Sequence, residues 1–357
     1  MVSPPKRKEI IERERNNGKL IAGIFPIHYP RELLRAFDIH PVEIWGPPGV
    51  DPKRGNAHLQ SYICSIVRNG LSFLLEKAYK IVDLILVPHN CDSLQGLGSL
   101  LTDFIDAGKP SLVFYPPRGK GECDIRFLTS EIKRLYGELR KITGKAPDEE
   151  RLLYEIEREE KAEERLLELY RKRARLSIES YDFYRVIRAR EYLDPDTLME
   201  VCNNIKEAEI RTHLKPILLS GIVPEPMEML TRIEEVGAYI AADDLASCRR
   251  RIYGKGKSRD PFMRMAERLL KGPPDPTRGS SFEERKAFIK GLIQETGAKA
   301  VVFYNIKFCE AEEFYYPIIK SFLKDMEVKS VEVEIDLNDP LPQQALTRIN
   351  ALIESVE

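Results

Sequence analysis

A continuous apolar run in the first third of the chain limits the possible fold more than any other feature. Residues 80–92 read KIVDLILVPHNCD, in which the apolar run ends at a turn that contains proline and asparagine. A run of this length, bounded by turn residues, is typical of a strand that is covered on both faces, as in a parallel sheet. Cys91 follows the carboxyl end of this predicted strand, which is where open α/β sheets bind their ligands.

A second stretch repeats the arrangement of an apolar run followed by a cysteine. Residues 299–309 read KAVVFYNIKFC, so Cys309 also follows the end of a predicted strand. Loops from several strands converge at the carboxyl edge of a parallel sheet. We therefore expect the two thiols to occupy similar positions at two separate strand ends.

The order of the predicted elements divides the chain into three parts. Strands alternate with helices early and late in the sequence, which predicts parallel sheets with right-handed crossovers. Between them, residues 148–175 are dense in Glu, Arg and Leu at helical spacing, which predicts a helix with charge pairs on its outer face. With 357 residues, the chain is too long for one ordinary core. We predict an α/β protein with an N-terminal α/β domain (1–124), a helical segment (125–212) and a C-terminal α/β domain (213–357).

The charge balance gives no preference for a polyanionic partner. Lys and Arg number 56 and Asp and Glu number 57, a net charge of −1, so no global field favours nucleic acid or an anionic membrane. No segment approaches the ~20 apolar residues that a membrane helix needs, and the start of the chain lacks the apolar centre of a signal peptide. We expect a cytoplasmic protein that binds neither nucleic acid nor membranes.

The six cysteines are few and far apart, which argues against a disulfide framework. Cys64, Cys91 and Cys309 are the candidates for a shared site. Three thiolates without an obvious fourth protein ligand suit an iron-sulfur cluster with one iron left open, whereas structural zinc normally takes four ligands. No C-x-x-C motif is present, however, and a single free cysteine is commonly a small buried apolar side chain. We favour that simpler interpretation for the other cysteines, Cys123, Cys202 and Cys248.

Several segments resemble, in order, the successive blocks of one known family. The resemblance is to the benzoyl-CoA reductase and 2-hydroxyacyl-CoA (2-hydroxyglutaryl-CoA) dehydratase family, and it runs from about residue 20 to the C-terminus. The QSYIC block, with the PREL segment before it, is most similar to the small C-type subunit of benzoyl-CoA reductase. The matching segments are IFPIHYPRELLRAFDIHPVEIWG, HLQSYICSIVRNGLSFLL, VDLILVPHNCD, ILLSG followed by EEVGAYIAADD, and VVFYNIKFCEAEEFYYPIIKSFL with VEIDLNDPLPQQALTRINALIE.

This resemblance implies a fold, a cofactor and a set of partners. The family's fold is two flavodoxin-like or Rossmann-like α/β domains with added helices, and the cysteines that match Cys64, Cys91 and Cys309 hold a 4Fe-4S cluster. An ATP-hydrolysing iron-sulfur activase delivers a low-potential electron, which the cluster relays to an acyl-CoA substrate for aromatic ring reduction or 2-hydroxyacyl-CoA dehydration. A homologous second cluster subunit is expected as partner.

Two other functions stay open at this point. One is a non-catalytic iron-sulfur electron-transfer or accessory subunit that holds the same cluster and binds no acyl-CoA. The other is an α/β binding protein whose thiols are free and reduced. No ATP site is expected on this chain, because the GKGKS segment at residues 254–258 lacks both the strand and the earlier glycine of a phosphate-binding loop.

Polar residues just after predicted strands are the candidate catalytic groups. A histidine near a cluster can donate a hydrogen bond to a sulfur or move a proton, which makes His28 and His89 candidates. Asp244 ends another strand beside Asp243, at a place where a crevice is expected. The simpler interpretation is a polar turn for the histidines and helix N-capping for the acids. Arg68, one helical turn after Cys64, is a candidate for offsetting cluster charge or contacting a CoA phosphate, or belongs to a solvated helix face.

Overall fold

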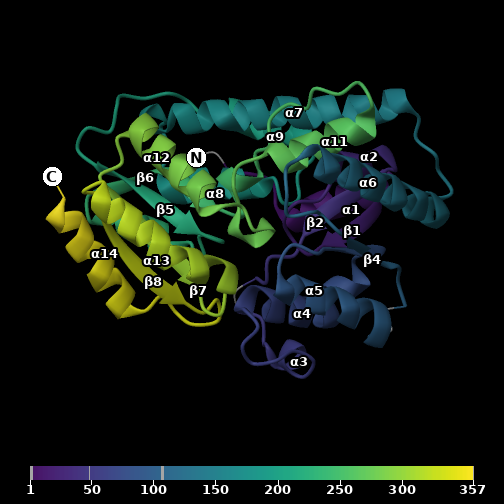
Figure 1. Ribbon diagram of the computed structural model, residues 1–357, viewed down its shortest axis with the longest axis horizontal. Helices are drawn as coiled ribbons and strands as arrows, with labels where there is room; N and C mark the ends of the chain where they lie inside the picture. The colour runs from purple at the N-terminus through teal and green to yellow at the C-terminus, as the bar shows by residue number, and fades with distance from the viewer. Residues whose placement is uncertain (1–2, 48, 106–107, 357) are drawn as a thin grey trace.

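The protein contains two sheets of four parallel strands, seen side by side in a computed structural model that describes residues 3–47, 49–105 and 108–356 (Figure 1). The first sheet has the order β2-β1-β3-β4 and the second the order β6-β5-β7-β8. The predicted α/β fold class is therefore confirmed. The strands are β1 (Leu20–Ile24), β2 (Ile39–Glu43), β3 (Leu84–Pro88), β4 (Ser111–Phe114), β5 (Lys215–Gly221), β6 (Ala238–Leu245), β7 (Ala300–Ile306) and β8 (Lys329–Ile335).

The strand predicted within residues 80–92 is covered on both faces. All five residues of β3 are buried. Leu84 and Leu86 belong to one apolar cluster, whereas Ile85 and Val87 belong to another. Successive side chains of a strand point to opposite faces, so each face of this sheet packs against its own apolar layer.

Helices surround the sheets and link the strands. In the N-terminal part they are α1 (Arg7–Asn16), α2 (Arg31–Ala36), α3 (Lys53–Asn56), α4 (Ser65–Glu76), η1 (Ala78–Lys80), α5 (Asp92–Ser99) and the π-helical η2 (Leu100–Phe104). In the C-terminal part they are α10 (Glu228–Glu235), η4 (Arg249–Arg251), α11 (Pro261–Lys271), η5 (Pro276–Arg278), α12 (Phe282–Thr296), α13 (Glu310–Asp325) and α14 (Gln343–Ser355). None of the helices in the described ranges is long and apolar enough to cross a membrane.

The middle of the chain is helical, as the sequence predicts. It forms α6 (Glu122–Thr143), α7 (Glu149–Arg171), η3 (Arg173–Arg175), α8 (Ser180–Ala189) and α9 (Pro195–Asn203). Figure 1 shows α7 running along the length of the molecule, from beside the first sheet to beside the second. The proposed domain boundaries at residues 124 and 212 stay a prediction.

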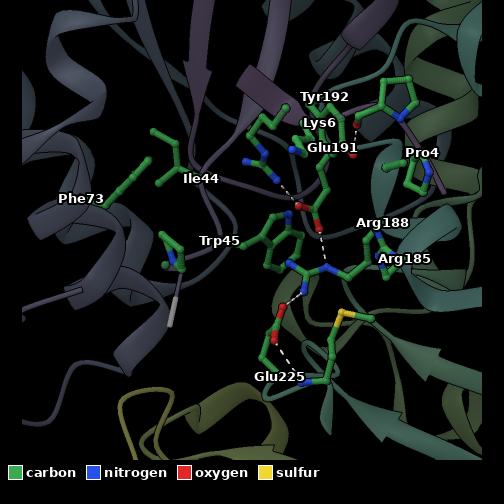
Figure 2. Close-up of a pocket in the computed structure, with 16 residues that line it drawn as sticks. Pro4, Lys6, Ile44, Trp45, Phe73, Arg185, Arg188, Glu191, Tyr192 and Glu225 are labelled. Atoms are coloured by element: carbon green, nitrogen blue, oxygen red, sulfur yellow. Dashed lines mark hydrogen bonds and ion pairs between the residues drawn. The ribbon is translucent and has the colours of Figure 1, made fainter. Parts of the chain in front are cut away.

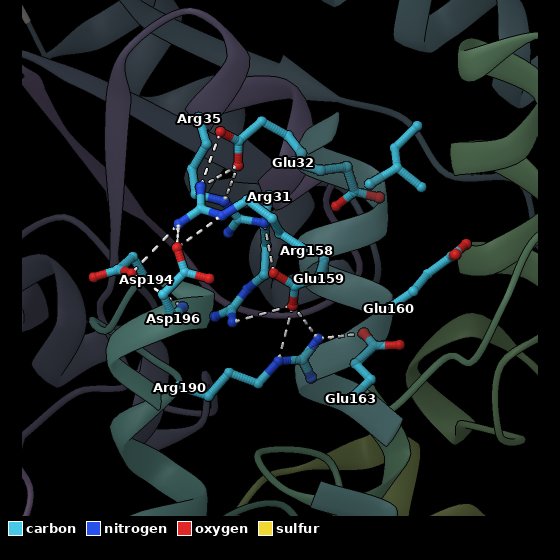
Figure 3. Close-up of polar contacts among 12 residues, drawn as sticks. Arg31, Glu32, Arg35, Arg158, Glu159, Glu160, Glu163, Arg190, Asp194 and Asp196 are labelled. Atoms are coloured by element: carbon cyan, nitrogen blue, oxygen red, sulfur yellow. Dashed lines mark hydrogen bonds and ion pairs between the residues drawn. The ribbon is translucent and has the colours of Figure 1, made fainter. Parts of the chain in front are cut away.

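The charges of α7 lie differently from the expectation. Glu155, Glu159, Glu160 and Glu163 are at most 3% exposed, so they form an inner face rather than the predicted outer one. The reason is that arginines from distant elements reach them, which the helix sequence alone does not reveal (Figure 3). We call this set the α7 network: Arg35, Glu155, Arg158, Glu159, Glu160, Glu163, Arg190, Arg264 and Arg268.

The two sheets have equivalent topologies, and this places two cysteines alike. β3 and β7 each occupy the third position in the order of their sheet, next to β1 and β5 respectively. Cys91 follows β3, and Cys309 follows β7. The two thiols are thus at corresponding strand ends of the two sheets, as we expected from the two apolar runs.

Candidate functional site

Folding brings Cys64, Cys91 and Cys309 together in the wall of one pocket of about 280 Å³. Cys91 and Cys309 come from the carboxyl ends of β3 and β7, and Cys64 immediately precedes α4. Between them, the three cysteines are contributed by both halves of the chain. The pocket is also lined by Asn90, Asp92, Ser93, Arg118, Pro276, Thr277, Gly279, Phe308, Glu310, Ala311, Phe314 and Tyr315.

Each of the three cysteines is the N-cap residue of a helix. Cys64 caps α4, Cys91 caps α5 and Cys309 caps α13. Backbone N–H groups of the first helical turn face each sulfur. Because a helix N-terminus carries partial positive charge and free N–H donors, this arrangement favours negative charge on the sulfurs.

The thiols are nevertheless hard to ionise without a bound cation. Burial raises the pKa of Cys91 to about 12 and also raises the pKa of Cys64. Burial, reinforced by the neighbouring Cys64, raises the pKa of Cys309 well above its usual range. Thiolates are the form that binds metal, so a metal centre here would displace protons as it binds.

The residues present fit an iron-sulfur cluster better than a single metal ion. Within residues 3–47, 49–105 and 108–356, no group of His, Cys, Asp or Glu side chains is placed to hold one ion. Cluster cysteines bind separate irons and need not converge on one point. Among the described lining residues, no fourth cysteine or any histidine is present, so one iron would lack a cysteine or histidine ligand from this chain.

Contacts with the C-terminal end of the second sheet hold the helix that follows Cys64. Arg68 donates to Asp336 over 3.1 Å, and the backbone N–H of Leu337 donates to the Ser65 hydroxyl over 3.2 Å. Asn69 and Asn338 exchange side-chain hydrogen bonds of 2.8 and 2.9 Å. The Arg68 side chain is 13% exposed, so it lies in an interface between the two halves rather than on a solvated helix face.

A glycine allows α4 to approach the end of β2 closely. Gly46 has a φ of +64°, and a Cβ atom at this position would lie 2.4 Å from the carbonyl oxygen of Ile66. Ile66 is in the first turn of α4, two residues after Cys64. Only glycine tolerates both the backbone conformation and the contact, so this position helps to define where Cys64 lies.

The outer rim of the pocket is charged and aromatic. Arg118 and Asp92 are exposed and lie 4.0 Å apart, and Phe314 is 71% exposed. An aromatic ring this exposed beside a pocket is typical of a binding surface.

His28 lies in a buried polar group and not among the residues that line this pocket. Its Nδ1 lies 3.0 Å from the Tyr253 hydroxyl, and its Nε2 lies 3.3 Å from Asp275. Burial, with the nearby Arg278, lowers the pKa of His28 to about 4, so the imidazole is neutral at neutral pH. His89 is half-buried, with its ring edge-on to Tyr115 at 5.3 Å, and it too is outside the described lining.

Asp244 is completely buried in a ring of ion pairs. It accepts hydrogen bonds from Arg250 over 2.6 Å and from Arg285 over 2.9 Å. Burial alone would raise the pKa of Asp244, but these two arginines outweigh it and hold the pKa below its usual value. The structure therefore separates His28, His89 and Asp244 from the thiols, and their catalytic role stays a prediction.

Sequence reasoning missed the partners of this ring. Glu312 and Arg285 complete it, and neither stands out in the sequence. The one available signal was the acidic run after Cys309, CEAEE, which is equally typical of the first turn of any helix. The arginines come from other elements and carry no mark of their own.

Trp45, the residue after another strand, lines a separate pocket of about 400 Å³ (Figure 2). Arg188 lies in its wall and pairs with both Glu191 and Glu225. Arg7 pairs with Glu191 as well. The charges around this pocket thus neutralise one another.

The other three cysteines do not line the thiol pocket. Cys202 is fully buried on α9, Cys248 is buried beside Ser247, and Cys123 is exposed on α6. Buried apolar packing accounts for the first two without any ligand.

Comparison with known proteins identifies relatives along the whole chain. Residues 26–356 match the family model described as 2-hydroxyglutaryl-CoA dehydratase, D-component. The chain is 25% identical to lactoyl-CoA dehydratase subunit beta of Anaerotignum propionicum, over 99% of this chain and 96% of that relative. It is also 25% identical to the (R)-phenyllactyl-CoA dehydratase beta subunit of Clostridium sporogenes, over 100% and 96% of the two chains.

A relative with a different named activity matches over a similar length. The C-type polypeptide of benzoyl-CoA reductase from Thauera aromatica is 22% identical over 94% of this chain and 91% of its own length. The resemblance stated from the sequence segments is thereby confirmed. The chain belongs to the 2-hydroxyglutaryl-CoA dehydratase D-component family, whose relatives include subunits of CoA-thioester dehydratases and of benzoyl-CoA reductase.

Proposed function

We propose that this chain is the 4Fe-4S cluster subunit of an acyl-CoA enzyme, in which the cluster relays a low-potential electron to a CoA thioester. The reaction is either aromatic ring reduction or dehydration of a 2-hydroxyacyl-CoA. The observation that carries the proposal is the meeting of three cysteines, each at the start of a helix, in one pocket. The relatives, which are named for both reactions, support the substrate class.

The chain's own residues would perform three tasks at such a centre. Cys64, Cys91 and Cys309 would hold the irons as thiolates, and the first-turn N–H groups would stabilise the negative charge on their sulfurs. The buried walls would limit access of water, which influences the reduction potential. When bound, the cluster supplies one-electron transfer.

The same proposal includes two protein partners. The relatives are named as individual subunits of larger enzymes, which supports a homologous second subunit that completes the enzyme. An ATP-hydrolysing iron-sulfur activase would deliver the electron. The backbone N–H groups of Gly256, Lys257 and Ser258 donate to Glu160 and Glu267, so they are already engaged, which supports placing ATP hydrolysis on another chain.

Anaerobic purification with iron and sulfide analysis and EPR spectroscopy tests the proposal. We expect the wild-type chain to hold iron and sulfide and to give an EPR signal after reduction. Cys64→Ser, Cys91→Ser and Cys309→Ser should each lose most of this iron. Cys202→Ser is the matched control, because Cys202 is equally buried but lies on α9 away from the pocket. Full retention of iron when all three pocket cysteines are replaced would refute the proposal.

A non-catalytic electron carrier is the second candidate, and the size of the pocket favours it. Pockets that hold a drug-sized ligand usually measure about 300–1,000 Å³. The thiol pocket measures about 280 Å³, so a cluster leaves little room in it for an acyl-CoA as well. Benzoyl-CoA or a 2-hydroxyacyl-CoA that changes the EPR signal of the enzyme would support the catalytic role. No change with a panel of thioesters would support the carrier.

A further inference from the structure

Four buried side chains form a closed ring of ion pairs behind the thiol pocket. They are Asp244 at the end of β6, Arg250 in η4, Arg285 in α12 and Glu312 in α13, and none is more than 2% exposed. We call this set the Glu312 ring. Two arginines face two carboxylates, so the charges within the ring cancel.

The ring is connected through both carboxylates. Arg250 donates from Nε to Asp244 over 2.6 Å and from Nη1 to Glu312 over 2.5 Å. Arg285 donates from Nη2 to Asp244 over 2.9 Å and to Glu312 over 2.7 Å. Ser220 at the end of β5 donates to Asp244 over 2.9 Å. The ring therefore links the ends of two adjacent strands to two helices.

Glu312 connects this ring to one of the three thiols. It is the third residue of α13, and Cys309 is the N-cap of the same helix. The backbone N–H groups of Glu312 and Glu313 both donate to the carbonyl of Cys309, over 2.9 and 3.0 Å. A displacement of the Glu312 side chain would move the first turn of α13, and the cysteine at its start with it.

The opposite wall of the pocket depends on the same charges. Arg250 lies 4.0 Å from Asp275, which caps η5 by accepting from the backbone N–H and the hydroxyl of Thr277, over 2.8 and 2.6 Å. The guanidinium of Arg285 lies over the ring of Tyr315, 5.5 Å from its centroid. Both Thr277 and Tyr315 line the pocket. The ring thus lies behind two of its walls.

We propose that the Glu312 ring positions the Cys309 thiol toward the pocket, so that Asp244, Arg250, Arg285 and Glu312 are positioning residues for this one metal ligand. The inference rests on the proposed function only where it calls Cys309 a ligand; the positioning itself concerns the thiol. Buried ion pairs of this kind hold their partners in place because breaking one leaves an uncompensated charge. Ligand orientation by such neighbouring groups is a general property of metal sites.

A matched pair of variants separates positioning from general stability. Glu312→Gln removes one charge from the ring with little change of shape. Glu159→Gln does the same in the α7 network, where Glu159 accepts from Arg35 over 2.6 Å and from Arg190 over 2.7 Å (Figure 3). Glu159 is also buried, at 3% exposure, and receives two arginines as Glu312 does. Both variants should lose stability, but only Glu312→Gln should affect Cys309.

The readout is the alkylation rate of each cysteine in the metal-free full-length chain, measured by mass spectrometry under native conditions. Exposed Cys123 serves as the internal reference. We expect Glu312→Gln to raise the rate at Cys309 roughly tenfold, because local opening of the first turn of α13 exposes the thiol, and to leave Cys91 within about twofold. An equal rate at Cys309 in Glu312→Gln and Glu159→Gln would overturn the inference.

Two further measurements make the test complete. Arg285→Lys keeps the charge but loses the fork that reaches both carboxylates, so it should give a smaller rise at Cys309 even if Glu312→Gln does not fold. A rate at Cys309 in Arg285→Lys equal to wild type would overturn the inference. In the reconstituted chain, Glu312→Gln should shift the EPR signal of the cluster, whereas Glu159→Gln should not. A wild-type chain that binds no iron would refute the proposed function alone, because the alkylation test needs no metal.

Discussion

The α7 network and the Glu312 ring are both built from buried arginines and carboxylates, yet they connect different parts of the molecule. The α7 network joins helices to helices: Glu159 receives Arg35 from α2 and Arg190 from the end of α8 (Figure 3). The Glu312 ring joins the ends of two strands to the helix that begins after Cys309. One network therefore holds the helical layer together, and the other holds a wall of the thiol pocket.

This difference shows that a buried, shifted acid does not by itself mark a functional site. Burial alone would raise the pKa of Glu159, but Arg35 and Arg190 hold it well below its usual range. Asp244 is held low by Arg250 and Arg285 against the same effect of burial. The direction of the shift is the same in both networks. What distinguishes them is the neighbouring group that each network keeps in place.

The largest expected effect comes from removing a carboxylate of the α7 network. Glu159→Ala leaves Arg35 and Arg190 buried without this partner, which should lower the free energy of unfolding by about 3–5 kcal/mol. Chemical denaturation followed by circular dichroism measures the change. The exposed Glu228, which pairs with Arg232, is the control, and Glu228→Ala should change stability by no more than about 0.5 kcal/mol. Equal effects in the two variants would mean that the α7 network contributes little.

A smaller effect is expected where backbone contact, rather than charge, positions a thiol. Gly46→Ala forces a Cβ atom into the first turn of α4 and a side chain into a left-handed backbone conformation, at a cost of about 2–4 kcal/mol. The alkylation rate of Cys64 should rise while that of Cys309 stays constant. The control is Gly96→Ala on α5, where a Cβ atom meets nothing within 4 Å, so stability should not fall. A rise at Cys309 equal to that at Cys64 would contradict separate positioning of the thiols.

The smallest effect is a difference in pH dependence between the two networks. Burial and Arg278 lower the pKa of His28 to about 4, and His28 contacts Asp275 beside the Glu312 ring. Below pH 6.5 the unfolded chain binds a proton at this histidine that the folded chain does not, so stability falls as the pH falls. Between pH 6.5 and 5 the wild type should lose about 2 kcal/mol relative to His28→Asn.

The α7 network provides the comparison for this titration. The pKa of Glu159 lies well below pH 5, so the stability difference between wild type and Glu159→Gln should stay nearly constant over the same interval. Denaturation curves at several pH values measure both differences. A flat difference for His28→Asn would show that His28 does not remain neutral in the folded chain.

Long-range order in the sequence predicted the sheets and the meeting of the thiols. The apolar runs before Cys91 and Cys309 correspond to β3 and β7, because a strand buried on both faces must be apolar throughout. One strand was placed too late: we expect residues 42–45 from the sequence, whereas β2 spans Ile39–Glu43. Pro41 obscures this strand, and it is tolerated because β2 is at the edge of its sheet.

Contacts between distant charges were not predictable from the sequence. The glutamates of α7 have the spacing of an exposed helix, and their burial depends on arginines from α2, α11 and residue 190. His28 and Asp244 follow strands as expected, but neighbouring elements enclose both of them. Position at a strand end is thus a local property, whereas access to the pocket depends on how the whole chain packs.

Native mass spectrometry of the anaerobically reconstituted chain tests the central claim, that folding gathers Cys64, Cys91 and Cys309 into one cluster site. The account predicts a mass increase of four irons and four sulfides in the wild type and in Cys202→Ser, and none in Cys309→Ser. An increase that persists in Cys309→Ser, or that is absent from the folded wild type, would contradict it.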